Sequence, residues 1–149
     1  RPDGTLVKEI PVPIEGHLPI SDEVRDYIRK ALAQVPVTGT AAAVFRGFDF
    51  NRVKVGGKTG TAEVYGKNDT SWFASFAPAD KPRFVAVVMV SQGGWGASTA
   101  APAVRRIWEG IFGVGKGEDG KPLKPALPDG MPPAALPVIR MGWRPSDAR

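Results

Sequence analysis

The spacing of apolar residues predicts an amphipathic helix early in the chain. Ser21 is a favoured N-cap residue, and Asp22 and Glu23 place negative charge in the first turn. Apolar residues then recur with helical spacing on one face: Val24, Tyr27, Ile28, Ala31, Leu32 and Val35. Pro36 ends the pattern because proline cannot continue a helix. We therefore expect a helix between Ser21 and Pro36 whose apolar stripe packs in the core.

Three segments with the apolar pattern of strands follow this helix. They are residues 53–64 (VKVGGKTGTAEV), 70–77 (TSWFASFA) and 84–90 (FVAVVMV). Short polar or proline-containing turns separate them, which predicts an antiparallel meander. The third segment is apolar throughout, as in a strand that is covered on both faces.

A second helix is expected after the glycine-rich loop Gly93-Gly94-Trp95-Gly96. Pro102 suits its first turn and Gly113 its C-terminus. Its apolar face consists of Ala103, Val104, Ile107, Trp108, Ile111 and Phe112. From Val114 onward the sequence becomes rich in proline and glycine. We therefore divide the chain into a folded portion, residues 1–113, and an extended, largely disordered tail, residues 114–149.

Composition narrows the class of protein. With 149 residues, 42% hydrophobic and 23% charged, the chain is typical of a globular domain. The net charge is +5, but the basic residues are scattered, so nucleic acid is not an expected partner. There is no cysteine, which excludes disulfides and cysteine-based metal sites. No apolar run approaches the length of a membrane span. His17, the single histidine, is expected to be exposed in a loop.

The main candidate for chemistry is residues 58–61, Lys-Thr-Gly-Thr. In an extended chain, Lys58 and Gly60 share one face, and Thr59 and Thr61 share the other. Two hydroxyl donors beside an ammonium suit a carboxylate ligand, and Gly60 lets another group approach closely. A phosphate-binding P-loop is disfavoured, since Arg52 stands where that motif needs its first glycine. On these four residues alone, a glycine-rich surface strand or hairpin that binds no ligand is the better interpretation.

Taken in order, these elements and three motifs resemble the C-terminal half of a class B penicillin-binding protein transpeptidase domain. The motifs are residues 57–63 (GKTGTAE), residues 72–78 (WFASFAP), and Gly93-Gly94 followed by Ala100-Ala101-Pro102. The similarity covers residues 3–113 and looks most like an elongation-type, actinobacterial enzyme. It implies an α+β fold of the β-lactamase/transpeptidase type, with helices on both sides of a mainly antiparallel sheet, of which only the C-terminal part is present.

The resemblance implies acyl transfer through a serine ester. However, no serine of this chain has lysine at +3 or asparagine at +2, the spacings of the family's nucleophile and loop motifs. The nucleophile is therefore expected outside this chain, in a missing N-terminal half. The Thr59 and Thr61 hydroxyls would hold the carboxylate of a D-Ala-D-Ala stem peptide or a penicillin, and Lys58 would face the missing serine loop. The Thr61 N–H would form half of the oxyanion hole, and Gly60, which has no side chain, would leave room for the acyl group. Trp95 is a further candidate for a substrate contact.

The same resemblance implies peptidoglycan stem peptides and β-lactams as ligands. The missing half of the domain and a membrane glycan polymerase are the implied protein partners, at the extracytoplasmic face of the cell membrane. No cofactor, metal or nucleic acid is expected. Three other functions remain open: a penicillin-binding sensor domain, a serine β-lactamase of the same fold, and a non-catalytic interaction module that binds through its proline-rich tail.

Overall fold

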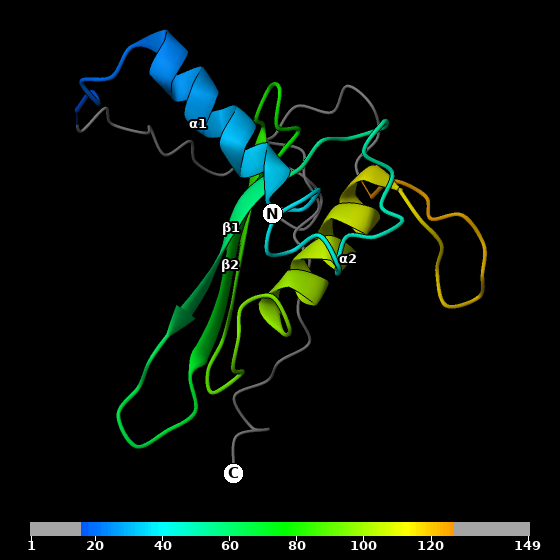
Figure 1. The fold of residues 1–149 in the computed structure, drawn as a ribbon. Coiled ribbons are helices and arrows are strands. Elements are labelled where there is room, and N and C mark those ends of the chain that lie inside the picture. Colours follow the sequence, from blue (N-terminus) through cyan, green and yellow to red (C-terminus); the bar gives the residue numbers. More distant parts are fainter. Residues whose placement is uncertain (1–15, 127–149) are drawn as a thin grey trace, which may run out of the picture. The chain divides into compact units, whose positions relative to one another are not determined.

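The computed structural model describes residues 16–126, which contain two helices and three strands in the order α1, β1, β2, β3, α2 (Figure 1). Their bounds are α1 Asp22–Gln34, β1 Gly56–Ala62, β2 Thr70–Ala77, β3 Phe84–Val90 and α2 Ala100–Phe112. All five elements belong to one compact unit, Leu18–Ala126. Their order and approximate positions are those predicted from the apolar pattern.

The three strands form an antiparallel meander in the order β1-β2-β3, as predicted. In the register, Thr59 of β1 lies opposite Phe73 of β2, and Phe73 lies opposite Val88 of β3. Within residues 16–126, β1 is therefore an edge strand that pairs on one side only. An edge strand leaves backbone N–H and C=O groups available to a further chain or ligand.

Helix α2 covers one face of this sheet and forms the core with it. Ser71, Phe73, Ser75 and Ala77 alternate along β2 and are buried against α2. Trp108 of α2 is fully buried, as predicted, and its Nε1–H donates to Ser75 Oγ at 3.0 Å. The sequence between α1 and β1 completes the core, where Phe45 stacks on Phe73 with 6.2 Å between ring centroids.

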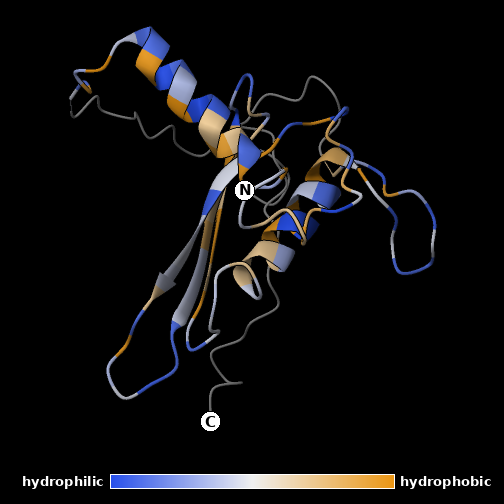
Figure 2. Ribbon diagram, in the orientation of Figure 1, coloured by the Kyte–Doolittle hydropathy of each residue, from blue (hydrophilic) through white to orange (hydrophobic). Residues whose placement is uncertain are grey.

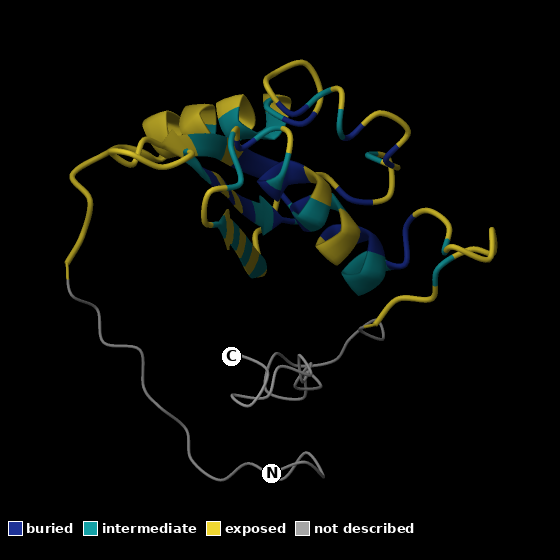
Figure 3. Cartoon of the chain, turned by 90° about the horizontal axis from the view of Figure 1, so that it is seen from below, coloured by how far each residue is buried: buried dark blue, intermediate teal, exposed yellow. Residues whose placement is uncertain are grey.

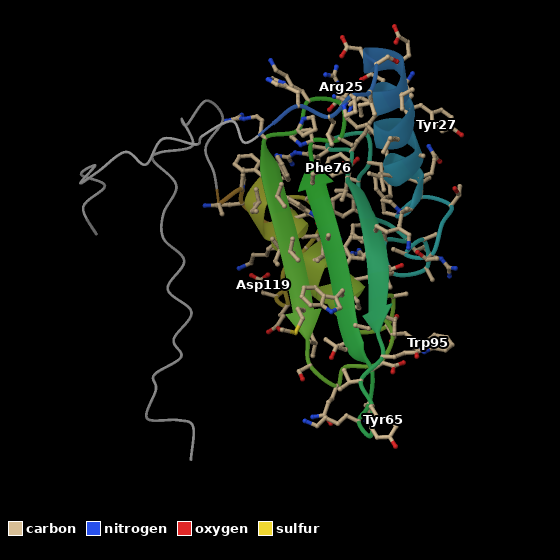
Figure 4. All side chains as sticks on the ribbon, turned by 90° about the vertical axis from the view of Figure 1, so that its left-hand side faces the viewer. Arg25, Tyr27, Tyr65, Phe76, Trp95 and Asp119 are labelled. Atoms are coloured by element: carbon tan, nitrogen blue, oxygen red, sulfur yellow. The ribbon has the colours of Figure 1, made fainter. Side chains whose placement is uncertain are left out.

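The opposite face of the sheet is open (Figure 4). Trp72 of β2 and the β3 residues Val85, Val87 and Met89 are exposed there, with Val85 at 76%. Residues 84–90 are apolar throughout, which led us to expect cover on both faces. In the described part of the chain, α2 provides cover on one face only.

Helix α1 begins as predicted but is not packed as predicted. Ser21 is the N-cap, and its Oγ accepts a hydrogen bond from the Val24 N–H at 3.3 Å. A side-chain hydrogen bond with Ser21 also holds the pKa of Glu23 below its ordinary value. The expected core packing is wrong for the part of the apolar stripe that lies within α1, because no residue of α1 is buried and Tyr27 is 74% exposed (Figures 2 and 3). Val35, at the C-cap, is partly buried and packs against the core, as expected. The helical period identifies an apolar face, but it does not supply a neighbour to cover it.

Helix α2 ends at Gly113, as predicted, in a left-handed conformation with φ 62°. The compact unit continues beyond it: Val114 is buried, and the Ala126 N–H donates to Gly110 O at 2.9 Å. The predicted boundary after residue 113 therefore falls inside this unit. Residues 1–15 of the predicted folded portion and residues 127–149 of the predicted tail lie outside the described residues. Neither α1 nor α2 has the length and hydropathy that a membrane-spanning helix requires.

Candidate functional site

Strand β1 carries the Lys-Thr-Gly-Thr sequence, and the sheet register separates its side chains as predicted. Lys58 lies opposite Ala74 and Gly60 opposite Trp72, so both belong to the open face. Thr59 lies opposite the buried Phe73, and Thr61 lies opposite the buried Ser71. The two threonines therefore share the face that α2 covers, although Thr61 itself is exposed.

This strand geometry excludes the P-loop interpretation. A P-loop places its lysine in a loop that leads directly into a helix. Here Lys58 lies within β1, and the next element along the chain is β2. The backbone is consequently extended where a phosphate-binding loop would have to curl around its ligand.

Lys58 is exposed, and its Nζ donates a hydrogen bond to Thr59 O at 2.9 Å. Among residues 16–126, no carboxylate lies within ion-pair distance of this ammonium. Its charge is therefore available to an anion that approaches β1.

Thr61 is positioned by the loop between β3 and α2. Its Oγ1 accepts a hydrogen bond from the Gly96 N–H at 3.4 Å. A Cβ on Gly96 would lie 2.5 Å from the carbonyl oxygens of Gly60 and Trp72, so the close approach of this loop requires glycine. The neighbouring Trp95 is 73% exposed and projects away from the sheet beside the end of β1 (Figure 4).

The loop itself is tied down by hydroxyl groups. Trp95 O accepts hydrogen bonds from Ser71 Oγ at 3.0 Å and from Ser98 Oγ at 2.9 Å. Thr99 Oγ1 donates to Gly93 O at 2.6 Å. These bonds fix the backbone of the loop from both sides of Gly96, which keeps its N–H directed at Thr61.

Thr59 has a partner that the sequence did not indicate. Its Oγ1 lies 2.9 Å from Thr40 Oγ1, in the segment between α1 and β1. The hydropathy pattern cannot reveal a contact between residues that are 19 positions apart. The tetrapeptide Thr-Gly-Thr-Ala occurs at both 38–41 and 59–62, a repeat that could have drawn attention to Thr40.

The serines nearest to β1 are structural. Ser71 Oγ donates to Trp95 O and accepts from the Ala100 N–H, and this serine is fully buried. Ser75 Oγ donates to Ala86 O and accepts from Trp108 Nε1–H, and Ser75 is 3% exposed. Neither hydroxyl can reach a ligand on β1, so neither is a candidate nucleophile.

The candidate site on β1 is an exposed strand surface and is separate from the hollow beside α1. A hollow of about 460 Å³ lies between α1, the segment before β1 and the turn after β2, and its lining includes Arg29, Lys54 and Asp80. Lys58, Thr59 and Thr61 do not line it. Within residues 16–126 there is also no group of three or more His, Cys, Asp or Glu side chains that could hold a metal ion. We therefore take β1, and not this hollow, as the candidate site.

Comparisons with known proteins agree with this fold. Residues 4–109 match the model of the penicillin binding protein transpeptidase domain. Peptidoglycan D,D-transpeptidase MrdA of Haemophilus influenzae is 32% identical over 38% of this chain and 11% of that protein. Stage V sporulation protein D of Bacillus subtilis is 39% identical over 64% of this chain and 16% of that protein.

A solved structure is also similar: Pseudomonas aeruginosa PBP2 in complex with WCK 5153. It superposes with a TM-score of 0.52 and 32% identity over 65% of this chain and 20% of that chain. The chain thus spans between 11% and 20% of the length of these relatives. The family match, the relatives and the shared fold agree, and the chain belongs to the penicillin-binding protein transpeptidase domain family, with the β-lactamase/transpeptidase-like fold that its sequence predicted.

Proposed function

We propose that this chain supplies the substrate-binding strand of a peptidoglycan D,D-transpeptidase that cross-links stem peptides through a serine acyl-enzyme. The observation that carries the proposal is the position of residues 58–61 in this family's fold. They lie on the edge strand β1, whose Lys58 ammonium has no ion-pair partner among residues 16–126 and whose two threonine hydroxyl oxygens each have one partner.

The two threonines would hold the terminal carboxylate of the stem peptide, or the carboxylate of a β-lactam. Residues i and i+2 of a strand are about 6.8 Å apart and point to the same face. One carboxylate that accepts an O–H···O bond of about 2.7 Å on each oxygen can bridge such a gap. Thr61 Oγ1 already accepts from Gly96 N–H, so its own hydrogen remains to be donated.

Lys58 and the backbone of Thr61 would act on the reacting groups. The exposed Lys58 ammonium would raise the positive potential around the nucleophile and the incoming carboxylate. The Thr61 N–H would donate to the oxyanion of the tetrahedral intermediate, together with the N–H of the nucleophile. Loss of one such donor typically costs about 3–4 kcal/mol of transition-state stabilisation.

The serine nucleophile would come from the rest of the transpeptidase domain. Two observations support this: the chain has no serine with lysine at +3, and Ser71 and Ser75 are buried with both hydroxyl functions occupied. The exposed apolar stripe of α1 and the open face of the sheet would be covered by the same missing part. The assembled domain would work at the extracytoplasmic face of the membrane, where its peptidoglycan substrate is found.

Covalent labelling tests the proposal. The complete transpeptidase domain is incubated with a fluorescent penicillin and digested, and the adduct is located by mass spectrometry. We expect one adduct on a serine outside residues 1–149, and no adduct on this chain alone. A stoichiometric adduct on a serine of this chain would contradict the proposal that the nucleophile lies outside residues 1–149.

A turnover assay then distinguishes the proposed transpeptidase from a penicillin-binding sensor domain and from a β-lactamase. A D,D-transpeptidase releases D-alanine from a D-Ala-D-Ala donor peptide and joins the remaining acyl group to an amine acceptor. A sensor domain would acylate once and stop, and a β-lactamase would hydrolyse the penicillin repeatedly. Cross-linked product is the result that we expect.

A further inference from the structure

The hydrogen bond between Thr40 and Thr59 has a direction that affects the candidate site. The two Oγ1 atoms are 2.9 Å apart, and either can be the donor. A hydroxyl has one hydrogen and can accept at its lone pairs. If Thr59 donates to Thr40, the hydroxyl hydrogen of Thr59 cannot also be donated to a ligand. If Thr40 donates to Thr59, the hydrogen of Thr59 remains available to a carboxylate on β1.

Thr40 is held near Thr59 by packing that does not depend on its hydroxyl. The next residue, Ala41, is fully buried, and its N–H donates to Val35 O at 3.2 Å. A little further along, Phe45 stacks on Phe73 at an interplanar angle of 27°. Phe73 is the residue that lies opposite Thr59 in the sheet. The segment is therefore anchored at the part of the sheet that carries Thr59.

Helix α2 fastens the same segment from a second direction. The Arg105 guanidinium donates from Nη1 to Val44 O and, at 3.0 Å, to Arg46 O. Its Nε donates to Glu109 Oε1 at 2.7 Å, and Glu109 is 3% exposed. With the segment fixed at both places, loss of the Thr40 hydroxyl removes one hydrogen bond without releasing the backbone.

The two threonines of the strand then have matching surroundings. Thr61 Oγ1 receives a hydrogen from the Gly96 N–H, which leaves the hydrogen of Thr61 free. We propose that Thr40 is a positioning residue that does the same for Thr59: its hydroxyl donates to Thr59 Oγ1 and directs the hydrogen of Thr59 toward the substrate carboxylate. Consecutive donors of this kind also polarise one another. This inference rests on the proposed carboxylate-binding role of Thr59.

The test uses Thr40→Val and Thr40→Ser in the complete transpeptidase domain, with the second-order rate of penicillin acylation as the readout. A neutral hydrogen bond is typically worth a factor of about 3–10, so Thr40→Val should slow acylation by about that factor. Thr40→Ser keeps the hydroxyl and should acylate as the wild type does. Thr38→Val is the matched control, since its exposed hydroxyl has only a 3.5 Å contact to Gln34 O, and its rate should not change.

Two further measurements distinguish positioning from a structural or direct role. With a penicillin methyl ester, which has no carboxylate, Thr40→Val should have no effect on the rate. In a Thr59→Val background, Thr40→Val should likewise cause no further loss, because it acts through Thr59.

Wild-type acylation by Thr40→Val alongside slow acylation by Thr59→Val would overturn this inference and leave the proposed function standing. Additive losses in the double variant would also overturn it, since they would mean that Thr40 contacts the carboxylate directly. Wild-type acylation by Thr59→Val itself would instead refute the proposed role of Thr59, and this inference would fall with it.

Discussion

Replacing Thr61 with valine should separate substrate binding from folding. The substitution keeps the β-branched shape that suits a strand and removes the hydroxyl. Thr61 is exposed, and the bond that its oxygen accepts from the Gly96 N–H is long, at 3.4 Å. The free energy of unfolding should therefore fall by no more than about 0.5–1 kcal/mol. The loss for the ligand is larger, since a hydrogen bond to a charged group is typically worth about 1.5–3 kcal/mol.

For Thr61→Val, the loss of about 1.5–3 kcal/mol in ligand binding corresponds to a penicillin acylation rate that is about 10- to 100-fold lower, while the thermal midpoint stays almost unchanged. The assay is the second-order acylation rate of the complete domain, measured alongside its thermal unfolding. Thr70→Val is the matched control. Thr70 of β2 lies opposite Ala62 of β1, and Ala62 is next to Thr61 along the strand, so the Thr70 side chain lies on the other face of the sheet from Thr61. Acylation of the Thr61 variant at the wild-type rate would refute the assignment of the carboxylate to this face. A large drop in the midpoint would show instead that the hydroxyl is mainly structural.

Three further predictions concern the surroundings of β1. Gly96→Ala should slow acylation and destabilise the domain by about 1–3 kcal/mol, because the added Cβ would lie 2.5 Å from two carbonyl oxygens; acylation and thermal unfolding at wild-type values would count against that contact. Glu109→Gln should destabilise by about 1–3 kcal/mol in urea unfolding, since the buried carboxylate pairs with Arg105 and Arg106; an unchanged midpoint would show that the two ion pairs contribute nothing. The isolated chain should self-associate through its open sheet face, and Val87→Lys, which places a charge there, should raise its monomer fraction in analytical ultracentrifugation; a monomeric parent chain would contradict this.

The strands were predictable because their apolar pattern is local. The alternation in residues 70–77 and the continuous apolar run in residues 84–90 reproduce β2 and β3 at both ends. The same period placed Thr59 and Thr61 on one face of β1, which the register confirms. These features depend on the conformation of a few consecutive residues, and a sequence contains that information directly.

Contacts between residues that are far apart in the sequence could not be predicted from the local apolar pattern. The periodicity of residues 24–35 correctly predicted an apolar helix face. Whether Tyr27 is buried depends on which element packs beside it, and no residue of the range 16–126 covers it. The contact of Thr40 with Thr59 depends on how the segment before β1 packs on Phe73 and on Arg105. The buried roles of Ser71 and Ser75 likewise follow from α2 lying on their face of the sheet. The roles proposed for Lys58 and the Thr61 N–H stay predictions.

The most direct test of the central claim is the crystal structure of the complete domain acylated by a penicillin. We predict that the penicillin carboxylate lies within hydrogen-bond distance, about 2.5–3.0 Å, of both Thr59 Oγ1 and Thr61 Oγ1. The acyl carbonyl oxygen should accept a hydrogen bond from the Thr61 N–H, with the ester on a serine outside residues 1–149. A carboxylate bound elsewhere, with both threonine hydroxyls left to solvent, would contradict the account.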